Sequence, residues 1–152
     1  MNWIFGNNIN TDLITPGRYN ITTDAQELAK IVFIEYRPEF VKTVKKGDLI
    51  IAGNNFGCGS SRETAVTALK TCGIKTIIAK SFARIFYRNC IDQGLLAIIA
   101  PIDNINENDN LKIDIEKQLV INILKKKKIK AVITHLMIKL YESAGIIPYL
   151  KK

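Results

Sequence analysis

The middle of the chain alternates short apolar runs with segments of helical character. The runs at residues 48–52, 75–80 and 95–100 have the length of buried strands, and residues 64–72 and 82–92 between them are predicted helices. This β-α-β-α-β order is typical of parallel strands joined by right-handed crossovers. We therefore predict an α/β fold with a mostly parallel core, in which ligands bind beyond the carboxyl ends of the strands.

The N-terminal part of the chain lacks this alternation. Residues 9–24 are rich in turn-forming residues, so we predict an extended loop there. Residues 25–31 and 38–44 are predicted to form short helices, the first of them capped by Asp24. Because loops held by a scaffold commonly carry specificity, the loop is a candidate for substrate recognition.

The pattern changes again beyond residue 102. Residues 111–115 and 119–123 are predicted to pair as a β-hairpin, and residues 133–144 repeat apolar side chains at helical spacing before a stop at Gly145. The chain has 152 residues, of which 47% are hydrophobic. That is enough for one core and too little for two, so we expect a single domain with an added hairpin and C-terminal helix.

The composition argues against several classes of protein. No apolar run reaches the roughly 18–20 residues of a membrane helix, and the N-terminus lacks the segments of a signal peptide. We therefore expect a cytoplasmic location and no membrane partner. The three cysteines, Cys58, Cys72 and Cys90, are too widely spaced for a disulfide framework or a zinc site. One thiolate at Cys58 cannot hold an iron–sulfur cluster, so we assign no metal to this chain.

The formal net charge of +8 comes mostly from the C-terminal end, where residues 125–152 carry eight lysines and one acidic residue. A run such as Lys125–Lys128 is most often a solvated turn, and no aromatic residues alternate with it to stack on bases. We therefore do not expect a nucleic-acid partner. A basic module that binds an anion or RNA is the alternative from another functional class, and an acidic protein partner fits the basic end better.

The most distinctive segment is the glycine-rich run at residues 53–63, which places Ser60, Ser61 and Arg62 between a predicted strand and a predicted helix. A helix N-terminus favours negative charge, because its first N–H groups are unpaired and the helix dipole is positive there. The guanidinium of Arg62 can hold a carboxylate through two parallel hydrogen bonds. The segment is therefore predicted to bind an anion.

Other interpretations of the same run are open. Ser60 followed by Glu63 also fits a capping box, in which the hydroxyl only satisfies a backbone donor of the helix. A nucleotide phosphate loop is disfavoured, because the run lacks the lysine that reaches the terminal phosphates. The local pattern thus gives the Ser60 hydroxyl either a chemical or a capping role.

Several segments together resemble the small subunits of 3-isopropylmalate dehydratase, which are equivalent to the swivelling domain of the aconitase superfamily. The resemblance covers nearly the whole chain, and its segments are 10–14, 16–19, 53–63, 80–89, 94–95 and 145–152. It implies a swivelling domain of β/β/α type that works as a hydro-lyase subunit. Members of the family interconvert 2-isopropylmalate and 3-isopropylmalate in leucine biosynthesis by dehydration and rehydration.

The resemblance also implies roles for individual residues. Ser60 matches the serine that acts as the catalytic base and removes a proton next to a carboxylate. Ser61 and Arg62 match substrate-binding positions. Asp12 matches an active-site aspartate that orients groups near the substrate, although in its sequence context it could instead close an Asx-type turn.

Substrate choice in the family is attributed to a short loop that corresponds to residues 19–22. Relatives that act on longer tricarboxylates carry an arginine at the position of Ile21. An apolar side chain there can pack against a branched alkyl group but cannot pair with an extra carboxylate. Tyr19 and Ile21 are therefore expected to bind an alkyl-malate, and homoaconitase and the methylmalate (citraconate) or dimethylmalate dehydratases are alternatives within the class.

In this family the four-iron four-sulfur cluster and its cysteine ligands belong to a separate large subunit. The resemblance thus implies that this chain supplies half of an active site and works only with that partner. Arg84 and Arg88, four residues apart on a predicted helix, are expected to be structural or partner-facing rather than catalytic.

Overall fold

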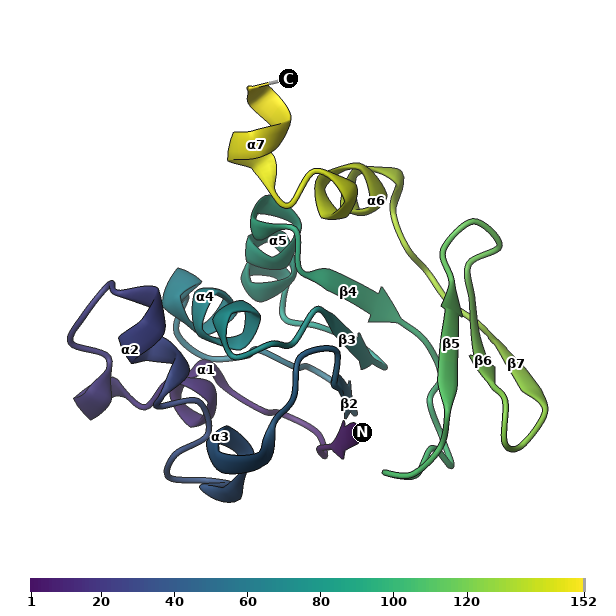
Figure 1. Cartoon of the computed structure of the whole chain (residues 1–152), viewed down its shortest axis with the longest axis horizontal. Helices are drawn as coiled ribbons and strands as arrows, with labels where there is room; N and C mark the ends of the chain where they lie inside the picture. The colour runs from purple at the N-terminus through teal and green to yellow at the C-terminus, as the bar shows by residue number, and fades with distance from the viewer. Residues whose placement is uncertain (152) are drawn as a thin grey trace.

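The computed structural model describes residues 1–151 and contains two β-sheets, with most of the helices gathered around the first (Figure 1). The larger sheet has four parallel strands in the order β1-β2-β3-β4. These strands are β1 (Asn2–Ile4), β2 (Leu49–Ala52), β3 (Thr76–Ala79) and β4 (Leu96–Ile99). The predicted parallel β-α-β-α-β core is confirmed, and β1 is an additional strand that the pattern did not predict.

The crossover helices α4 (Glu63–Thr71) and α5 (Arg84–Gln93) pack against each other beside this sheet. All four residues of β3 are buried, as expected for a parallel strand with neighbours on both sides. Helix α5 ends at Gly94, which has a left-handed conformation with φ 70°. A Cβ on Gly94 would lie 2.6 Å from the backbone nitrogen of Gly145, so glycine lets the end of α5 approach the C-terminal helices closely.

The segment between β1 and β2 is more ordered than its composition indicates. Residues 9–24 contain the short helix α1 (Thr11–Ile14) and the 3₁₀ helix η1 (Gly17–Tyr19), so the prediction of an extended loop is wrong for these residues and holds for residues 20–24. Helix α1 is capped because the side chain of Asn10 accepts a 2.8 Å hydrogen bond from the N–H of Leu13. This local bond gives the loop a defined shape.

The two short helices predicted next are confirmed as α2 (Ala25–Ala29) and α3 (Glu39–Thr43). The carboxylate of Asp24 caps α2, as predicted, by accepting a 3.0 Å hydrogen bond from the N–H of Glu27. Helix α2 packs against α4, and Phe40 of α3 is fully buried. The N-terminal segment is therefore fixed against the helix that follows the glycine-rich turn.

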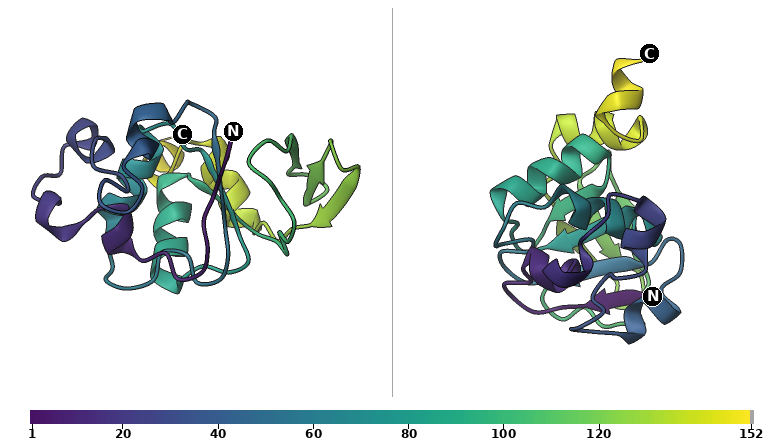
Figure 2. Two further views of the ribbon diagram at one scale, coloured as in Figure 1. Left: turned by 90° about the horizontal axis from the view of Figure 1, so that it is seen from below. Right: turned by 90° about the vertical axis from the view of Figure 1, so that its left-hand side faces the viewer.

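A second, antiparallel sheet of three strands stands to one side of the first (Figure 1, Figure 2). Strands β5 (Leu111–Asp114) and β6 (Leu119–Asn122) confirm the predicted hairpin, and β7 (Lys127–Lys130) pairs with β6. The run Lys125–Lys128 is therefore not simply a solvated turn, because its second half belongs to a strand. Strand β7 has a single apolar residue, Ile129, among its lysines. The sequence pattern therefore did not predict this strand.

The C-terminal region forms two helices. Helix α6 (His135–Glu142) confirms the predicted helix, and the hydroxyl of Thr134 caps it by accepting a 3.2 Å hydrogen bond from the N–H of Met137. Gly145 ends this segment as expected, with φ 117°. The chain then forms a further short helix, α7 (Ile146–Leu150), which projects from one end of the molecule (Figure 1). None of the helices within residues 1–151 combines the length and the apolar character that crossing a bilayer requires.

Candidate functional site

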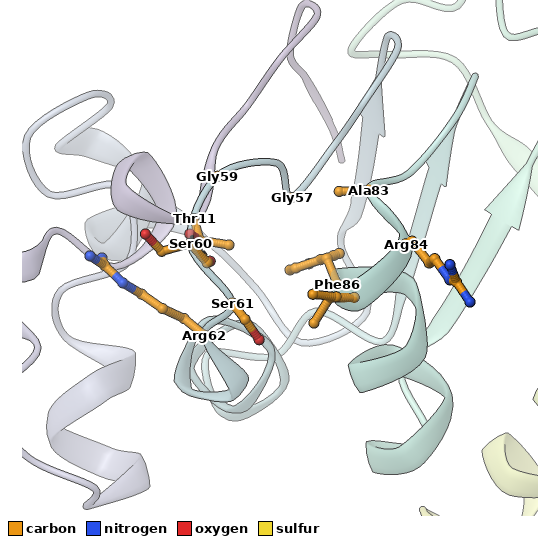
Figure 3. A pocket seen from close by; sticks show the side chains of 10 residues that line it. Thr11, Gly57, Gly59, Ser60, Ser61, Arg62, Ala83, Arg84 and Phe86 are labelled. Atoms are coloured by element: carbon orange, nitrogen blue, oxygen red, sulfur yellow. Dashed lines mark hydrogen bonds between the residues drawn. The ribbon is translucent and has the colours of Figure 1, made fainter.

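A cavity of about 240 Å³ opens where the turn after β2 meets the segment after β3 (Figure 3). This is the carboxyl edge of the parallel strands, where such sheets bind ligands. The residues that line the cavity are Thr11, Gly57, Gly59, Ser60, Ser61, Arg62, Ala83, Arg84, Ile85 and Phe86. The structure thus brings together the three residues that the glycine-rich run singled out.

The glycine-rich turn is fixed by backbone contacts on both sides. On one side, the N–H of Phe56 donates to the carbonyl of Ser81 at 3.1 Å, and its carbonyl accepts from the N–H of Ala83 at 2.9 Å. On the other side, the N–H of Thr11 donates to the carbonyl of Cys58 at 2.9 Å. The turn therefore bridges the start of α1 and the start of α5, which are far apart in the sequence.

Gly57 is required by this packing. It has a left-handed conformation, with φ 83°, and a Cβ built there would lie 2.1 Å from Cγ of Phe86. No side chain fits in that space, so glycine alone lets the turn lie directly on α5. The contact between Gly57 and Phe86 closes one wall of the cavity.

Ser60 has an exposed side chain, and its carbonyl accepts a 2.6 Å hydrogen bond from the hydroxyl of Thr11. Helix α4 begins only at Glu63, with Arg62 at the N-cap position and no side-chain hydrogen bond at that cap. The capping-box interpretation is therefore wrong. The Ser60 hydroxyl is left at the cavity, and the exposed side chain of Ser61 leaves the turn in a different direction (Figure 3).

Arg62 extends from the turn toward α1 (Figure 3). Its Nη1 donates hydrogen bonds to Oδ1 of Asp12 at 3.0 Å and to the carbonyl of Thr15 at 2.7 Å, and 22% of its side chain is exposed. Within residues 1–151, its Nε and Nη2 have no hydrogen-bond partner. Because Nε and Nη2 form one edge of the guanidinium, they can hold a carboxylate through two parallel hydrogen bonds.

Asp12 closes the loop after α1 in addition to holding Arg62. Its Oδ1 also accepts a 2.9 Å hydrogen bond from the N–H of Gly17. The hydrogen bond from Gly17, followed by that from Arg62, lowers the pKa of this carboxyl below its usual value. Asp12 thus bonds to the backbone N–H five residues further along the chain, which is too far for an Asx-type turn. It does not line the cavity.

The predicted substrate-recognition residues also lie outside the cavity lining. Ile21 is 87% exposed and Tyr19 is 38% exposed, and neither borders the cavity. The guanidinium of Arg18 lies 5.1 Å from the centre of the Tyr19 ring and forms an ion pair with Glu35. The contact of Tyr19 and Ile21 with a substrate therefore stays a prediction.

Five of the lining residues were not predicted as part of the site: Thr11, Ala83, Arg84, Ile85 and Phe86. Arg84 and Ile85 begin α5 after the short segment 80–83 that follows β3, so they lie at the same strand-end edge as the serines. The rule that ligands bind at strand ends could have found them. Thr11 acts on the backbone of Ser60, a contact that no sequence signal indicates. The side chain of Arg84 points away from the serines (Figure 3).

No cluster of three or more His, Cys, Asp or Glu side chains that could hold a metal ion occurs within residues 1–151. Thiolates, rather than thiols, bind metals. Burial raises the pKa of Cys72 to about 11 and also raises that of the fully buried Cys90, so both are protonated at neutral pH. This donor set does not fit an iron–sulfur cluster, which is held by several thiolates.

Comparison with known proteins places these features in a family. The aconitase C-terminal domain family matches residues 2–103 of the chain. The 3-isopropylmalate dehydratase small subunit 2 of Archaeoglobus fulgidus is 48% identical over 152 residues, which are 99% of this chain and 92% of that protein. The methanogen homoaconitase small subunit of Methanocaldococcus jannaschii is 50% identical over 149 residues, which are 97% of this chain and 88% of that protein.

A solved structure shares the fold. The crystal structure of a 3-isopropylmalate dehydratase from Methanocaldococcus jannaschii matches with a TM-score of 0.93 at 48% identity. The match covers 99% of this chain and 90% of that one. The parallel sheet, the antiparallel sheet and the helices described above are therefore features of a known architecture.

Proposed function

Since this chain belongs to the aconitase C-terminal domain family, we propose that it is the small subunit of a 3-isopropylmalate dehydratase, with residues 1–152 forming one swivelling domain. Such a hydro-lyase interconverts 2-isopropylmalate and 3-isopropylmalate in leucine biosynthesis, by removing water and adding it back with the positions exchanged. The identity with a dehydratase small subunit over nearly the full length of both chains supports this assignment, as does the matching dehydratase crystal structure.

The observation that carries the proposal is the open cavity in which Ser60, Ser61 and Arg62 meet at a strand end. Arg62 binds a substrate carboxylate through Nε and Nη2, and the Ser61 hydroxyl donates to the same ligand. The oxygen of Ser60, as an alkoxide, takes the proton from the carbon next to the carboxylate and returns it on rehydration. Positive charge from Arg62 and from the start of α4 stabilises the alkoxide.

The chain supplies only half of this reaction. In this family a cluster iron acts as the Lewis acid that takes the hydroxyl from the substrate, and the side chains within residues 1–151 offer no set of ligands for such a metal. We therefore place the four-iron four-sulfur cluster on a separate large subunit that docks over the cavity. The relatives' names as small subunits support such a partner. The three free cysteines favour a reducing compartment, so we place the complex in the cytoplasm.

Reconstitution tests the proposal. Co-expressed with a large subunit of the same family, the chain is expected to convert 2-isopropylmalate into 3-isopropylmalate, measured by chromatography of the products. Purified alone, the chain should be colourless and inactive, and the large subunit alone should be inactive as well. Brown colour and cluster absorbance in the isolated chain would contradict the assignment of the cluster to the partner.

A homoaconitase small subunit is the second candidate, because the methanogen homoaconitase small subunit is 50% identical to this chain. Ile21 favours the first candidate, since an apolar side chain cannot pair with the added carboxylate of homoaconitate. The reconstituted complex should be assayed on homoaconitate, methylmalate and dimethylmalate as well. A higher kcat/KM for homoaconitate than for 2-isopropylmalate would replace the proposal with the second candidate.

A further inference from the structure

One oxygen of Asp12 is shared by two donors from different parts of the chain. Oδ1 accepts hydrogen bonds from Nη1 of Arg62 at 3.0 Å and from the N–H of Gly17 at 2.9 Å. Arg62 belongs to the turn before α4, whereas Gly17 is the first residue of η1. We call residues 17–22, which include the substrate-choice loop at residues 19–22, the recognition loop. A single carboxylate oxygen thus joins the anion-binding arginine to the start of this loop.

Arg62 also lies close to the first residue of the recognition loop. A Cβ built on Gly17 would lie 3.3 Å from Oδ1 of Asp12 and 3.4 Å from Nη2 of Arg62. The first distance is slightly tighter than ordinary van der Waals contact and the second lies within its range, so little more than one methyl group would fit between Gly17 and these two side chains. The start of the recognition loop therefore lies close to both members of the Asp12–Arg62 pair.

The recognition loop is short, so the position of Gly17 determines where its remaining residues lie. The N–H of Tyr19 donates to the carbonyl of Pro16 at 2.9 Å, and the N–H of Asn20 donates to the carbonyl of Gly17 at 3.2 Å. Residues 16–20 are therefore one hydrogen-bonded turn. Ile21 follows directly and is 87% exposed, so its position is set mainly by where this turn begins.

We infer that Asp12 is a positioning residue that couples substrate selectivity to carboxylate binding, and is not a substrate ligand. The inference rests on the proposed function, because it assumes that both Arg62 and the recognition loop meet the substrate. Asp12 fixes the guanidinium and, through the same oxygen, the start of the loop. The site then selects substrates by one distance, which runs from the carboxylate that Arg62 binds to the alkyl group that contacts Ile21.

A carboxylate suits this role better than an amide. The carboxyl of Asp12 is ionised at neutral pH, because the hydrogen bonds from Gly17 and then from Arg62 lower its pKa. Charge-assisted hydrogen bonds are roughly twice as strong as neutral ones. Asp12→Asn keeps an acceptor oxygen but removes the charge, whereas Asp12→Ala removes both. The coupling should therefore be weakened in Asp12→Asn and lost in Asp12→Ala.

Kinetics of the reconstituted complex test the inference. In Asp12→Ala, KM for 3-isopropylmalate is expected to rise about tenfold while kcat falls less than about threefold. The ratio of kcat/KM for 3-isopropylmalate to that for 3-methylmalate is expected to fall about tenfold, because the loop is no longer held at a fixed position relative to Arg62. Asp12→Asn should lie between Asp12→Ala and the wild type. The control is Asp114→Asn, whose carboxylate accepts a 2.9 Å bond from the N–H of Lys117 on the antiparallel sheet, and it should change none of these values.

A second readout needs no activity. Amide hydrogen exchange of residues 17–20 in the isolated chain should be faster in Asp12→Ala than in the wild type, and unchanged in Asp114→Asn. If exchange were unchanged in both variants, the coupling would be refuted and the proposed function would still stand. If the wild-type complex were inactive, the proposed function would be refuted and the exchange measurement would still hold.

Two kinetic results would also overturn the inference. A fall in kcat of about a hundredfold at constant KM would mean that Asp12 acts on the reacting atoms. Equal losses of kcat/KM on the two substrates would mean that Asp12 does not influence selectivity. If Asp12→Ala does not fold, Asp12→Asn carries the same tests.

Discussion

The hydroxyl of Thr11 donates a 2.6 Å hydrogen bond to the carbonyl oxygen of Ser60. Thr11 is the first residue of α1 and is buried, so its hydroxyl has a fixed position. The bond engages the main chain of Ser60 and leaves the serine side chain exposed. The fold thus holds the backbone of the proposed base while its reactive oxygen remains available.

Ser60→Ala is expected to lower kcat of the reconstituted complex by about 10²- to 10⁴-fold, the usual contribution of a general base. KM should change by less than about threefold, because a base acts mainly in the transition state. The thermal midpoint should not change, since only the main chain of Ser60 bonds to Thr11. Ser61→Ala is the comparison variant and should raise KM more than it lowers kcat. Turnover close to wild type in Ser60→Ala would show that the base lies elsewhere.

Ile21→Arg is expected to shift preference toward a substrate with an added carboxylate, by about tenfold or more in the ratio of kcat/KM for homoaconitate to that for 3-isopropylmalate. Because Ile21 is 87% exposed, the change should leave the free energy of unfolding unaltered. Ile123→Arg, which adds the same charge at another exposed isoleucine, is the control. An unchanged preference would assign selectivity to a different residue.

Gly57→Ala is expected to destabilise the chain by about 2–5 kcal/mol, measured by urea unfolding. A left-handed conformation costs a side-chain-bearing residue about 1–2 kcal/mol, and the clash with Phe86 adds a cost typical of overpacking, about 1–3 kcal/mol. The control is Gly6→Ala, because a Cβ on Gly6 would meet nothing within 4 Å. Equal stability of the two variants would contradict the contact between the turn and α5.

Asp109 is expected to make the stability of the fold sensitive to acid. Its carboxylate accepts 2.9 Å hydrogen bonds from the N–H of Asn106 and from the side chain of Asn122, and the ammonium of Lys125 lies 3.2 Å away. The hydrogen bond from Asn106 is the main cause that lowers the pKa of Asp109 below its ordinary value of 3.8. A lowered pKa in the folded state means that stabilisation is complete above the unfolded pKa and is lost as pH falls through the folded pKa.

The comparison variant for this effect is Asp109→Asn. The difference in free energy of unfolding between wild type and variant should be constant near neutral pH and should shrink as pH falls below the ordinary value of 3.8. Chemical unfolding followed by circular dichroism at several pH values measures it. A difference that stays the same at about pH 6 and about pH 2.5 would show that the charge of Asp109 has no part in stability.

The strands that could be predicted are those whose own sequence determines them. The strands β2, β3 and β4 are short apolar runs between helices, and burial on both faces explains that composition. Strand β1 has three residues, too few to show a period, and it forms because β2 offers a parallel partner. Strand β7 has lysines around Ile129 and is a strand only because β6 offers backbone hydrogen bonds. Pairing of this kind depends on tertiary context more than on propensity.

The same division applies to the site. The side chains at positions 60–62 could be predicted, because they are adjacent in the sequence and follow a strand. Thr11 and Phe86 are brought to the cavity by the fold alone. The capping box failed because the bond from Thr11 holds Ser60 in the turn and the chain stays extended through Arg62, with φ −135°, so the helix starts later.

The antiparallel sheet leaves β7 at one of its edges, with Lys127, Lys128 and Lys130 exposed along it. An open edge presents unpaired N–H and C=O groups that can template aggregation with another extended chain. Lysines on that edge resist such growth, because a neighbouring strand would have to desolvate them and two like edges repel each other. The exposed lysines of β7 are therefore expected to disfavour edge-to-edge pairing between two copies of the chain.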